Sequence, residues 1–271
     1  GRGVAWAANK LGQKSVIFMP KGSTETRLKN IQAEGATATI EEYNYDECVR
    51  KAAAEAAKVP NGVVVQDTAW EGYEEIPAWI MQGYGTMALE ADEQFGERPT
   101  HVFVQAGVGS LAGAMVGYFA NKYKDNPPVM VVVEAEAAAC LYKGAVAGDG
   151  KIRIVEGDLN TIMAGLACGE PNITSWDILK NHADCFIAAE DVVAARGMRM
   201  LSAPLKGDPQ VVSGESGAAP FGALATIMLN DKYAELRKKL KLDSNSKVLL
   251  FSTEGDTDPI RWKNIIWEAK E

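Results

Sequence analysis

The sequence predicts an α/β protein built of two doubly wound parallel-sheet domains. Short apolar segments alternate with helical patterns along the whole chain of 271 residues, as strands alternate with crossover helices in such folds. Several apolar segments are continuous runs of β-branched residues, which indicates strands that are covered on both faces. A glycine-rich run also follows one predicted strand directly and opens a helical stretch.

The smaller domain is predicted over residues 1–72. The elements expected there are a helix over residues 1–8, strands over 15–19, 36–40 and 62–65, and a helix that opens at residue 45 and runs through the alanine-rich residues 52–57. Pro20 and Gly22 end the first strand, and Ser23 or Thr24 can cap the helix that follows. These βα repeats predict a compact unit.

The larger domain is predicted over residues 73–271, because residues 66–73 interrupt the strand and helix pattern. The elements expected there are a long helix over residues 76–93, strands over 102–104, 129–133, 185–188 and 248–251, a helix over 112–120, and a helix that starts at Pro259. Glycine- and proline-rich residues 144–160 and 203–215 are expected to form loops.

The composition is that of a soluble globular protein, with 47% hydrophobic and 24% charged residues. A net charge of -8 argues against nucleic acid and anionic membranes as partners, because the mean field of the protein repels polyanions. Neither a signal peptide nor a transmembrane segment is recognisable in the sequence.

Cysteine and histidine usage predicts a reduced, cytoplasmic protein without a metal site. The four cysteines form no CxxC pair, and we expect buried thiols, although Cys140 and Cys168 flank the candidate site and could pair on oxidation. His101 and His182 are the only histidines, so a histidine-based metal site or catalytic triad is not expected.

The glycine-rich run QAGVG at residues 105–109 is the main functional clue. Glycines let the backbone approach an anion, and the amides at the start of the following helix can bind a phosphate. We therefore expect Gly107, Val108, Gly109 and Ser110 to hold a phosphate group. A bare tight turn is the alternative interpretation.

Further polar residues follow other predicted strands, at the sheet edge where α/β proteins bind ligands. Asp67 follows the apolar residues 63–65 and is interpreted either as an acid/base carboxylate or as a turn former. Residues 251–258 contain Ser252 and Thr253, and either form part of a site or supply an N-cap at Asp256 or Asp258. Glu134 ends a strand and either orients the cleft or caps a helix.

Taken together, these loops resemble the diaminopropionate ammonia-lyase family. That family belongs to the fold-type II, tryptophan-synthase-β-like pyridoxal-phosphate enzymes, which also include threonine dehydratases. The segments that carry the resemblance span the chain and are GRGVAW (1–6), FMPKG (18–22), VQDTAWEGY (65–73), IMQGY (80–84), QAGVG (105–109), IMAGLACGEP (162–171), SGESG (213–217) and STEGDTD (252–258).

The resemblance implies pyridoxal 5'-phosphate as cofactor and an α,β-elimination that converts 2,3-diaminopropionate to pyruvate and two molecules of ammonia. It implies that the amides of residues 107–110 bind the phosphate, and that Ser252 or Thr253 contacts the pyridine nitrogen. It also implies an acid/base role for Asp67. Trp70 and Tyr73 would either wall the substrate pocket or belong to the core.

The sequence also departs from the family pattern. The lysine that forms the Schiff base and an acidic Asp-Gly-Asn-His loop would precede the helix that begins at Gly1, and lysines such as Lys10 and Lys21 match exposed positions instead. We therefore expect a larger domain that lacks its N-terminal part, and a chain that is inactive as given although its parent enzyme is a lyase.

Three other functions remain open at this point. The chain could be a threonine or serine dehydratase-like lyase, or a non-catalytic module that binds a phosphate or nucleotide. It could also be a regulatory homologue that dimerises through a sheet edge or through the helix that contains Trp262 and Trp267. For the lyase, the expected partners are a small amino-acid substrate and a second copy of the chain.

Overall fold

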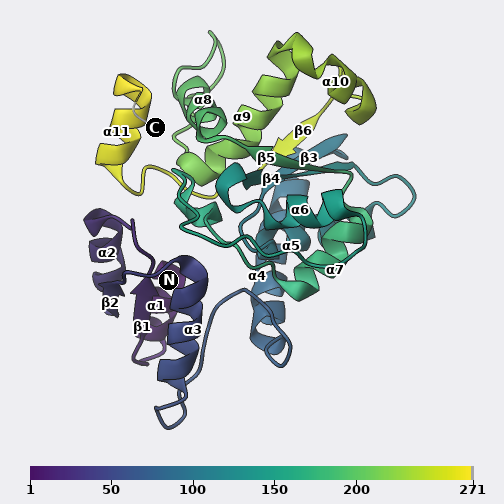
Figure 1. Ribbon diagram of the computed structural model, residues 1–271. Coiled ribbons are helices and arrows are strands. Elements are labelled where there is room, and N and C mark those ends of the chain that lie inside the picture. Colours follow the sequence, from purple (N-terminus) through teal and green to yellow (C-terminus); the bar gives the residue numbers. More distant parts are fainter. Residues whose placement is uncertain (270–271) are drawn as a thin grey trace. The chain divides into compact units, whose positions relative to one another are not determined.

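The computed structural model describes residues 1–269 and divides the chain into two compact α/β units (Figure 1). The first unit comprises Gly1–Gln66 together with Glu156–Leu159, and the second comprises Asp67–Val155 and Asn160–Glu271. The division falls after Gln66, whereas the sequence places it after residue 72. The reason is that carbonyl oxygens of Asp67 and Ala69 accept hydrogen bonds from residues of the second unit.

The first unit is a small parallel βα structure. Its elements are α1 (Arg2–Lys10), β1 (Val16–Met19), α2 (Glu25–Gln32), β2 (Thr37–Ile40) and α3 (Tyr45–Ala56). Strands β1 and β2 pair in parallel, with Val16 opposite Thr37. Thr24 caps α2 and Asn44 caps α3, and the Asn44 amide group also donates to the carbonyl oxygen of Gly157 at 3.1 Å.

The predicted strand over residues 62–65 is wrong. These residues form irregular chain after a turn at residues 57–61, and the side chains of Val63 and Val65 are 64% and 43% exposed. An apolar β-branched run becomes a strand only where a neighbouring strand accepts its hydrogen bonds, and among the described residues no strand pairs with this one.

The second unit contains a four-stranded parallel sheet in the order β5-β4-β3-β6. Its main elements are α4 (Glu75–Phe95), β3 (His101–Gln105), α5 (Ser110–Lys122), β4 (Val129–Ala135), α6 (Cys140–Ala147), α7 (Ile173–His182), β5 (Cys185–Ala189), α8 (Asp191–Ser202), α9 (Glu215–Leu229), α10 (Ala234–Leu240), β6 (Val248–Leu250) and α11 (Pro259–Glu268). Asp258 is the N-cap of α11 and Pro259 its first residue.

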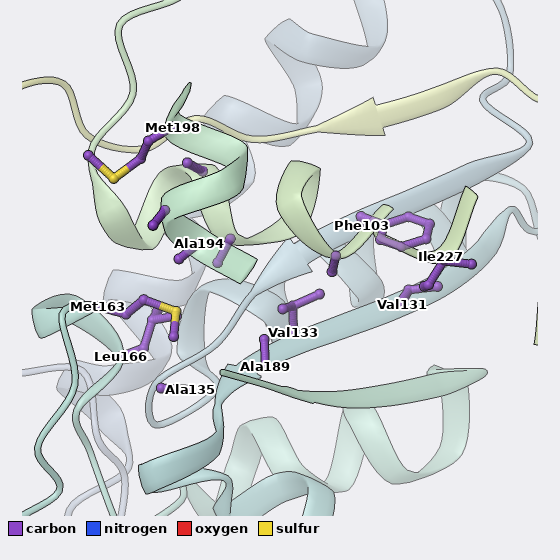
Figure 2. Close-up of a cluster of buried hydrophobic side chains, with 14 of the residues drawn as sticks. Phe103, Val131, Val133, Ala135, Met163, Leu166, Ala189, Ala194, Met198 and Ile227 are labelled. Atoms are coloured by element: carbon purple, nitrogen blue, oxygen red, sulfur yellow. The ribbon is translucent and has the colours of Figure 1, made fainter. Parts of the chain in front are cut away.

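Helices cover both faces of this sheet, as the β-branched runs predict (Figure 1). On one face, Phe103 and Val131 lie beside Ile227 of α9, in a buried hydrophobic cluster that also includes Ala194 of α8 (Figure 2). The intervening residues of the same strands, such as Val104, are also buried. They face the opposite side of the sheet, which α5 and α6 contact. Because the strands are parallel, the loops that follow them lie at one edge; residues 107–110 follow β3 and residues 252–253 follow β6, whereas Asp67 follows no strand.

Two further features are structural. The ring nitrogens of the buried His101 lie 2.7 Å from the Leu240 carbonyl oxygen and 2.7 Å from the Thr100 hydroxyl, so this histidine ties strand β3 to its surroundings. Among the described residues, no helix has both the length and the apolar character needed to cross a bilayer.

Candidate functional site

The glycine-rich loop lies between β3 and α5, with its carbonyl groups turned into the protein. The carbonyl oxygen of Val108 accepts from the Asn172 amide at 2.8 Å, and that of Gly109 accepts from the Ser175 hydroxyl. The carbonyl oxygen of Gly107 lies 4.0 Å from the Cys140 sulfur. In a trans peptide, the N–H of the next residue points away from the carbonyl. The N–H groups of Val108, Gly109 and Ser110 therefore point away from these contacts.

These amides form an anion cradle without a basic side chain. Within residues 1–269, the N–H groups of residues 107–110 donate to no protein acceptor, and they lie at the N-terminus of α5, whose dipole favours a negative charge. Gly107 has no room for a side chain, because a Cβ atom there would lie 3.1 Å from the Gly165 carbonyl oxygen and 3.2 Å from the Cys168 sulfur. Glycine at this position therefore lets the loop pack closely against residues 165–168.

The hydroxyl groups of Ser252 and Thr253 follow the neighbouring strand β6, and both residues are exposed. The Gln105 side-chain amide donates to the Thr253 hydroxyl at 2.7 Å and to the Phe251 carbonyl oxygen at 3.0 Å. The Ser252 hydroxyl lies 2.9 Å from the hydroxyl of Ser213. Because Gln105 also begins the glycine-rich run, it connects the Thr253 hydroxyl to the strand that leads into the anion cradle.

Asp67 is tied to the other end of the same loop. Its carbonyl oxygen accepts from the Ser110 hydroxyl at 2.6 Å and from the Asn172 side-chain amide at 2.7 Å. Burial raises the pKa of the Asp67 carboxyl above its ordinary value, although the hydroxyl of Tyr84 donates to it at 3.2 Å. Burial and the neighbouring Asp67 also raise the pKa of the Tyr84 phenol, so Tyr84 remains a proton donor in this pair.

The remaining candidate residues from the sequence are Glu134, two cysteines and two aromatic residues. The buried Glu134 carboxyl group accepts from the amides of Leu141 and Tyr142 at the start of α6, which agrees with the capping interpretation, and burial raises its pKa to about 8. Cys140 and Cys168 are buried free thiols. The rings of Trp70 and Tyr73 stack on each other with centroids 4.4 Å apart.

Three residues of this arrangement were not singled out from the sequence: Tyr84, Asn172 and Gln105. Each contacts a predicted site residue through a bond between separate parts of the chain; Asp67 and Asn172, for example, are 105 positions apart. Their positions inside or beside the quoted segments IMQGY, IMAGLACGEP and QAGVG are the only sequence signal. Nothing in their local pattern indicates which partner each one meets.

Known proteins share both the sequence and this architecture. Residues 1–254 match the family of the pyridoxal-phosphate dependent enzymes. The diaminopropionate ammonia-lyase of Salmonella typhimurium is 52% identical over 275 residues, and that of Escherichia coli K12 is 49% identical over 273 residues. Each alignment covers 100% of this chain and 68% of the relative, so the chain spans about two thirds of their length.

Solved structures agree with these alignments. The holo diaminopropionate ammonia lyase from Escherichia coli has a TM-score of 0.91 at 47% identity and covers 99% of this chain, which spans 67% of that protein. The same enzyme in complex with an aminoacrylate-PLP azomethine reaction intermediate also has a TM-score of 0.91 at 47% identity, over 100% of this chain and 69% of the other. With these relatives covered over two thirds of their length, the chain belongs to the diaminopropionate ammonia-lyase family of pyridoxal-phosphate dependent enzymes.

Proposed function

We propose that this chain forms part of a pyridoxal-phosphate dependent lyase that converts 2,3-diaminopropionate and water to pyruvate and two molecules of ammonia. The observation that carries the proposal is the row of outward-pointing amides at residues 108–110, in a chain about half identical to diaminopropionate ammonia-lyases. The E. coli relative, solved with an aminoacrylate-PLP intermediate, supports an elimination of this kind.

The residues of the second unit fit the cofactor's two polar ends. The N–H groups of residues 107–110 would hold the phosphate, and the hydroxyl of Ser252 or Thr253 would meet the pyridine nitrogen. When bound, the cofactor supplies an electron sink for the bonds at the substrate's α-carbon. A neutral hydroxyl at this position would not fully protonate the pyridine nitrogen, which would moderate that sink and favour loss of the β-amino group.

Asp67 would hold or move a proton during the elimination. Burial raises the pKa of its carboxyl, so the group binds a proton closer to neutral pH than an exposed aspartate does. The Tyr84 hydroxyl donates to one carboxyl oxygen, Oδ2, and so holds the carboxyl group in place. Protonated Asp67 can assist departure of the amine, and ionised Asp67 can remove a proton.

The reaction is tested with the full-length gene product. Purified protein is supplied with pyridoxal 5'-phosphate and 2,3-diaminopropionate, and pyruvate and ammonia are measured. The proposal predicts two molecules of ammonia for each pyruvate. A serine or threonine dehydratase would instead release one ammonia per oxo acid, from serine or threonine. An L-serine ammonia-lyase shares the fold of this chain at 20% identity. A non-catalytic phosphate-binding module would bind the cofactor and release no oxo acid.

The residue at the pyridine nitrogen is tested separately with Ser252→Ala and Thr253→Val. The substitution that removes the contacting hydroxyl should change the absorption spectrum of the bound cofactor and lower kcat. The other substitution should leave the spectrum unchanged. If neither variant altered the spectrum, the assignment of this loop to the ring nitrogen would be lost, while the phosphate assignment would stand.

We also propose a homodimeric enzyme of the cytoplasm. Free thiols at all four cysteines support a reducing compartment. Light scattering of the full-length protein measures the oligomeric state, and fractionation of the cells measures the location. A monomer, or recovery of the protein outside the cytoplasm, would contradict the respective proposal.

A further inference from the structure

We propose that Asn172 is a positioning residue that couples the phosphate-binding loop to the Asp67 segment. The inference rests on the proposed binding of pyridoxal phosphate to residues 107–110. It adds a role for a residue that would touch neither the cofactor nor the substrate.

Asn172 contacts both sides of the site at once. It is fully buried, and its backbone N–H donates to the carbonyl oxygen of Val108 at 2.8 Å. Its side-chain Nδ2 donates to the carbonyl oxygen of Asp67 at 2.7 Å and to the hydroxyl of Ser110 at 2.9 Å. One residue therefore holds the middle of the loop, the first residue of α5 and the backbone of Asp67.

The three side-chain contacts form a closed triangle. The Ser110 hydroxyl donates to the same Asp67 carbonyl oxygen at 2.6 Å, while it accepts from Asn172. Nδ2 donates into this triangle, and it also lies 3.8 Å from the sulfur of Met81. Because the N–H of Ser110 belongs to the anion cradle, a displacement of the cradle is transmitted to the Asp67 backbone through two buried hydrogen bonds.

Helix capping alone does not account for this arrangement. As N-cap of α7, Asn172 uses only its Oδ1 atom, which accepts from the amide of Ser175 at 2.9 Å. Serine and aspartate cap helices about as well as asparagine does. A residue chosen only for capping would not need Nδ2, whereas the coupling depends on Nδ2 entirely.

The substitutions Asn172→Ser and Asn172→Asp separate these two roles. Both keep an acceptor for the Ser175 amide and the backbone N–H toward Val108, and both remove Nδ2. Asn172→Asp also places a carboxylate oxygen against the Asp67 carbonyl oxygen, so it should have the larger effect. Asn44→Ser, at the N-cap of α3 in the other unit, is the matched control for the same exchange at a helix start.

The test uses the full-length protein and two measurements. The first is the dissociation constant of pyridoxal phosphate, which should rise about tenfold in Asn172→Ser, because a buried hydrogen bond is lost from the support of the loop. The second is amide hydrogen exchange of the apoprotein, which should accelerate in residues 105–112 and in residues 66–70 together. Asn44→Ser should change neither.

The outcomes are distinguishable. If Asn172→Ser bound the cofactor as tightly as wild type and exchange accelerated only in the first turn of α7, Asn172 would be a cap and the inference would be overturned. If wild type itself failed to bind pyridoxal phosphate, the proposed function would fail, while coupled exchange of the two segments would still support the positioning role.

Discussion

Gly109→Ala is the sharpest test of the phosphate-binding loop. Gly109 has φ of 101°, a conformation that L-residues rarely adopt, and it immediately precedes α5. A Cβ atom there would lie 3.0 Å from the Ser175 hydroxyl oxygen, 3.2 Å from a Leu141 methyl group and 3.3 Å from a Leu179 methyl group. The substitution therefore adds backbone strain and crowding at the same point.

The cost of Gly109→Ala in free energy of unfolding is the sum of backbone strain and overpacking. A residue other than glycine in such a backbone conformation costs about 1–3 kcal/mol. Overpacking by one carbon costs about 1–3 kcal/mol, and all three neighbours are side-chain atoms that can shift by a few tenths of an ångström, so the lower half of that range applies. We expect the free energy of unfolding to fall by about 2–5 kcal/mol.

Two other glycines separate the contributions. Gly96 has φ of 73°, and a Cβ atom added there would have no neighbour within 4 Å, so Gly96→Ala should cost only the strain, about 1 kcal/mol. Gly117 lies inside α5 with its nearest neighbour 3.6 Å from a Cβ atom, and Gly117→Ala should stabilise the protein by up to about 1 kcal/mol through helix propensity.

The assays are urea unfolding and titration with pyridoxal phosphate, both on the full-length protein. Gly109→Ala should weaken cofactor binding by about tenfold or more, because any shift of the loop moves the N–H groups of Val108 and Ser110. Gly96→Ala and Gly117→Ala should bind as wild type does. Wild-type stability and cofactor affinity in Gly109→Ala would refute the backbone geometry from which we derive the cradle.

Three more predictions concern carboxylates. Asp67→Asn should lower kcat about 10²–10⁴-fold with the cofactor still bound, as expected when an acid/base group is removed, and a smaller effect in steady-state assays would place the proton transfer elsewhere. Glu134 has a pKa raised by burial to about 8 from 4.5, so the folded protein retains a proton that the unfolded chain releases, and this contribution to stability declines between about pH 4.5 and pH 8. The melting temperature of Glu134→Gln should accordingly approach that of wild type as the pH rises through this window, and a constant difference would contradict the assignment. Asp92 is buried and accepts from the hydroxyl of Tyr123 at 2.6 Å, so Asp92→Asn should cost about 2–4 kcal/mol in urea unfolding, whereas Asp177→Asn at an exposed ion pair should cost less than about 0.5 kcal/mol, and equal costs would refute the distinction.

The local pattern of the sequence determined most of the secondary structure and the parallel character of the sheets. The β-branched run at residues 129–133 became part of β4, and Pro259 became the first residue of α11 with Asp258 as its cap. These features depend on neighbours a few residues away, so a short window of sequence contains the information. The glycine-rich loop was recognisable for the same reason, since its chemistry belongs to the backbone that follows β3.

Tertiary structure alone decided the features that depend on distant partners. The run at residues 62–65 has the composition of a strand but forms none, because pairing is settled by a neighbouring strand and not by the run itself. Likewise, the hydroxyl of Tyr84 on the Asp67 carboxyl and the amide of Asn172 on the Asp67 carbonyl are contacts between separate elements. Hydrogen bonds act over about 3 Å in space regardless of separation along the chain, so only the packing of α4 and α7 reveals what surrounds this aspartate.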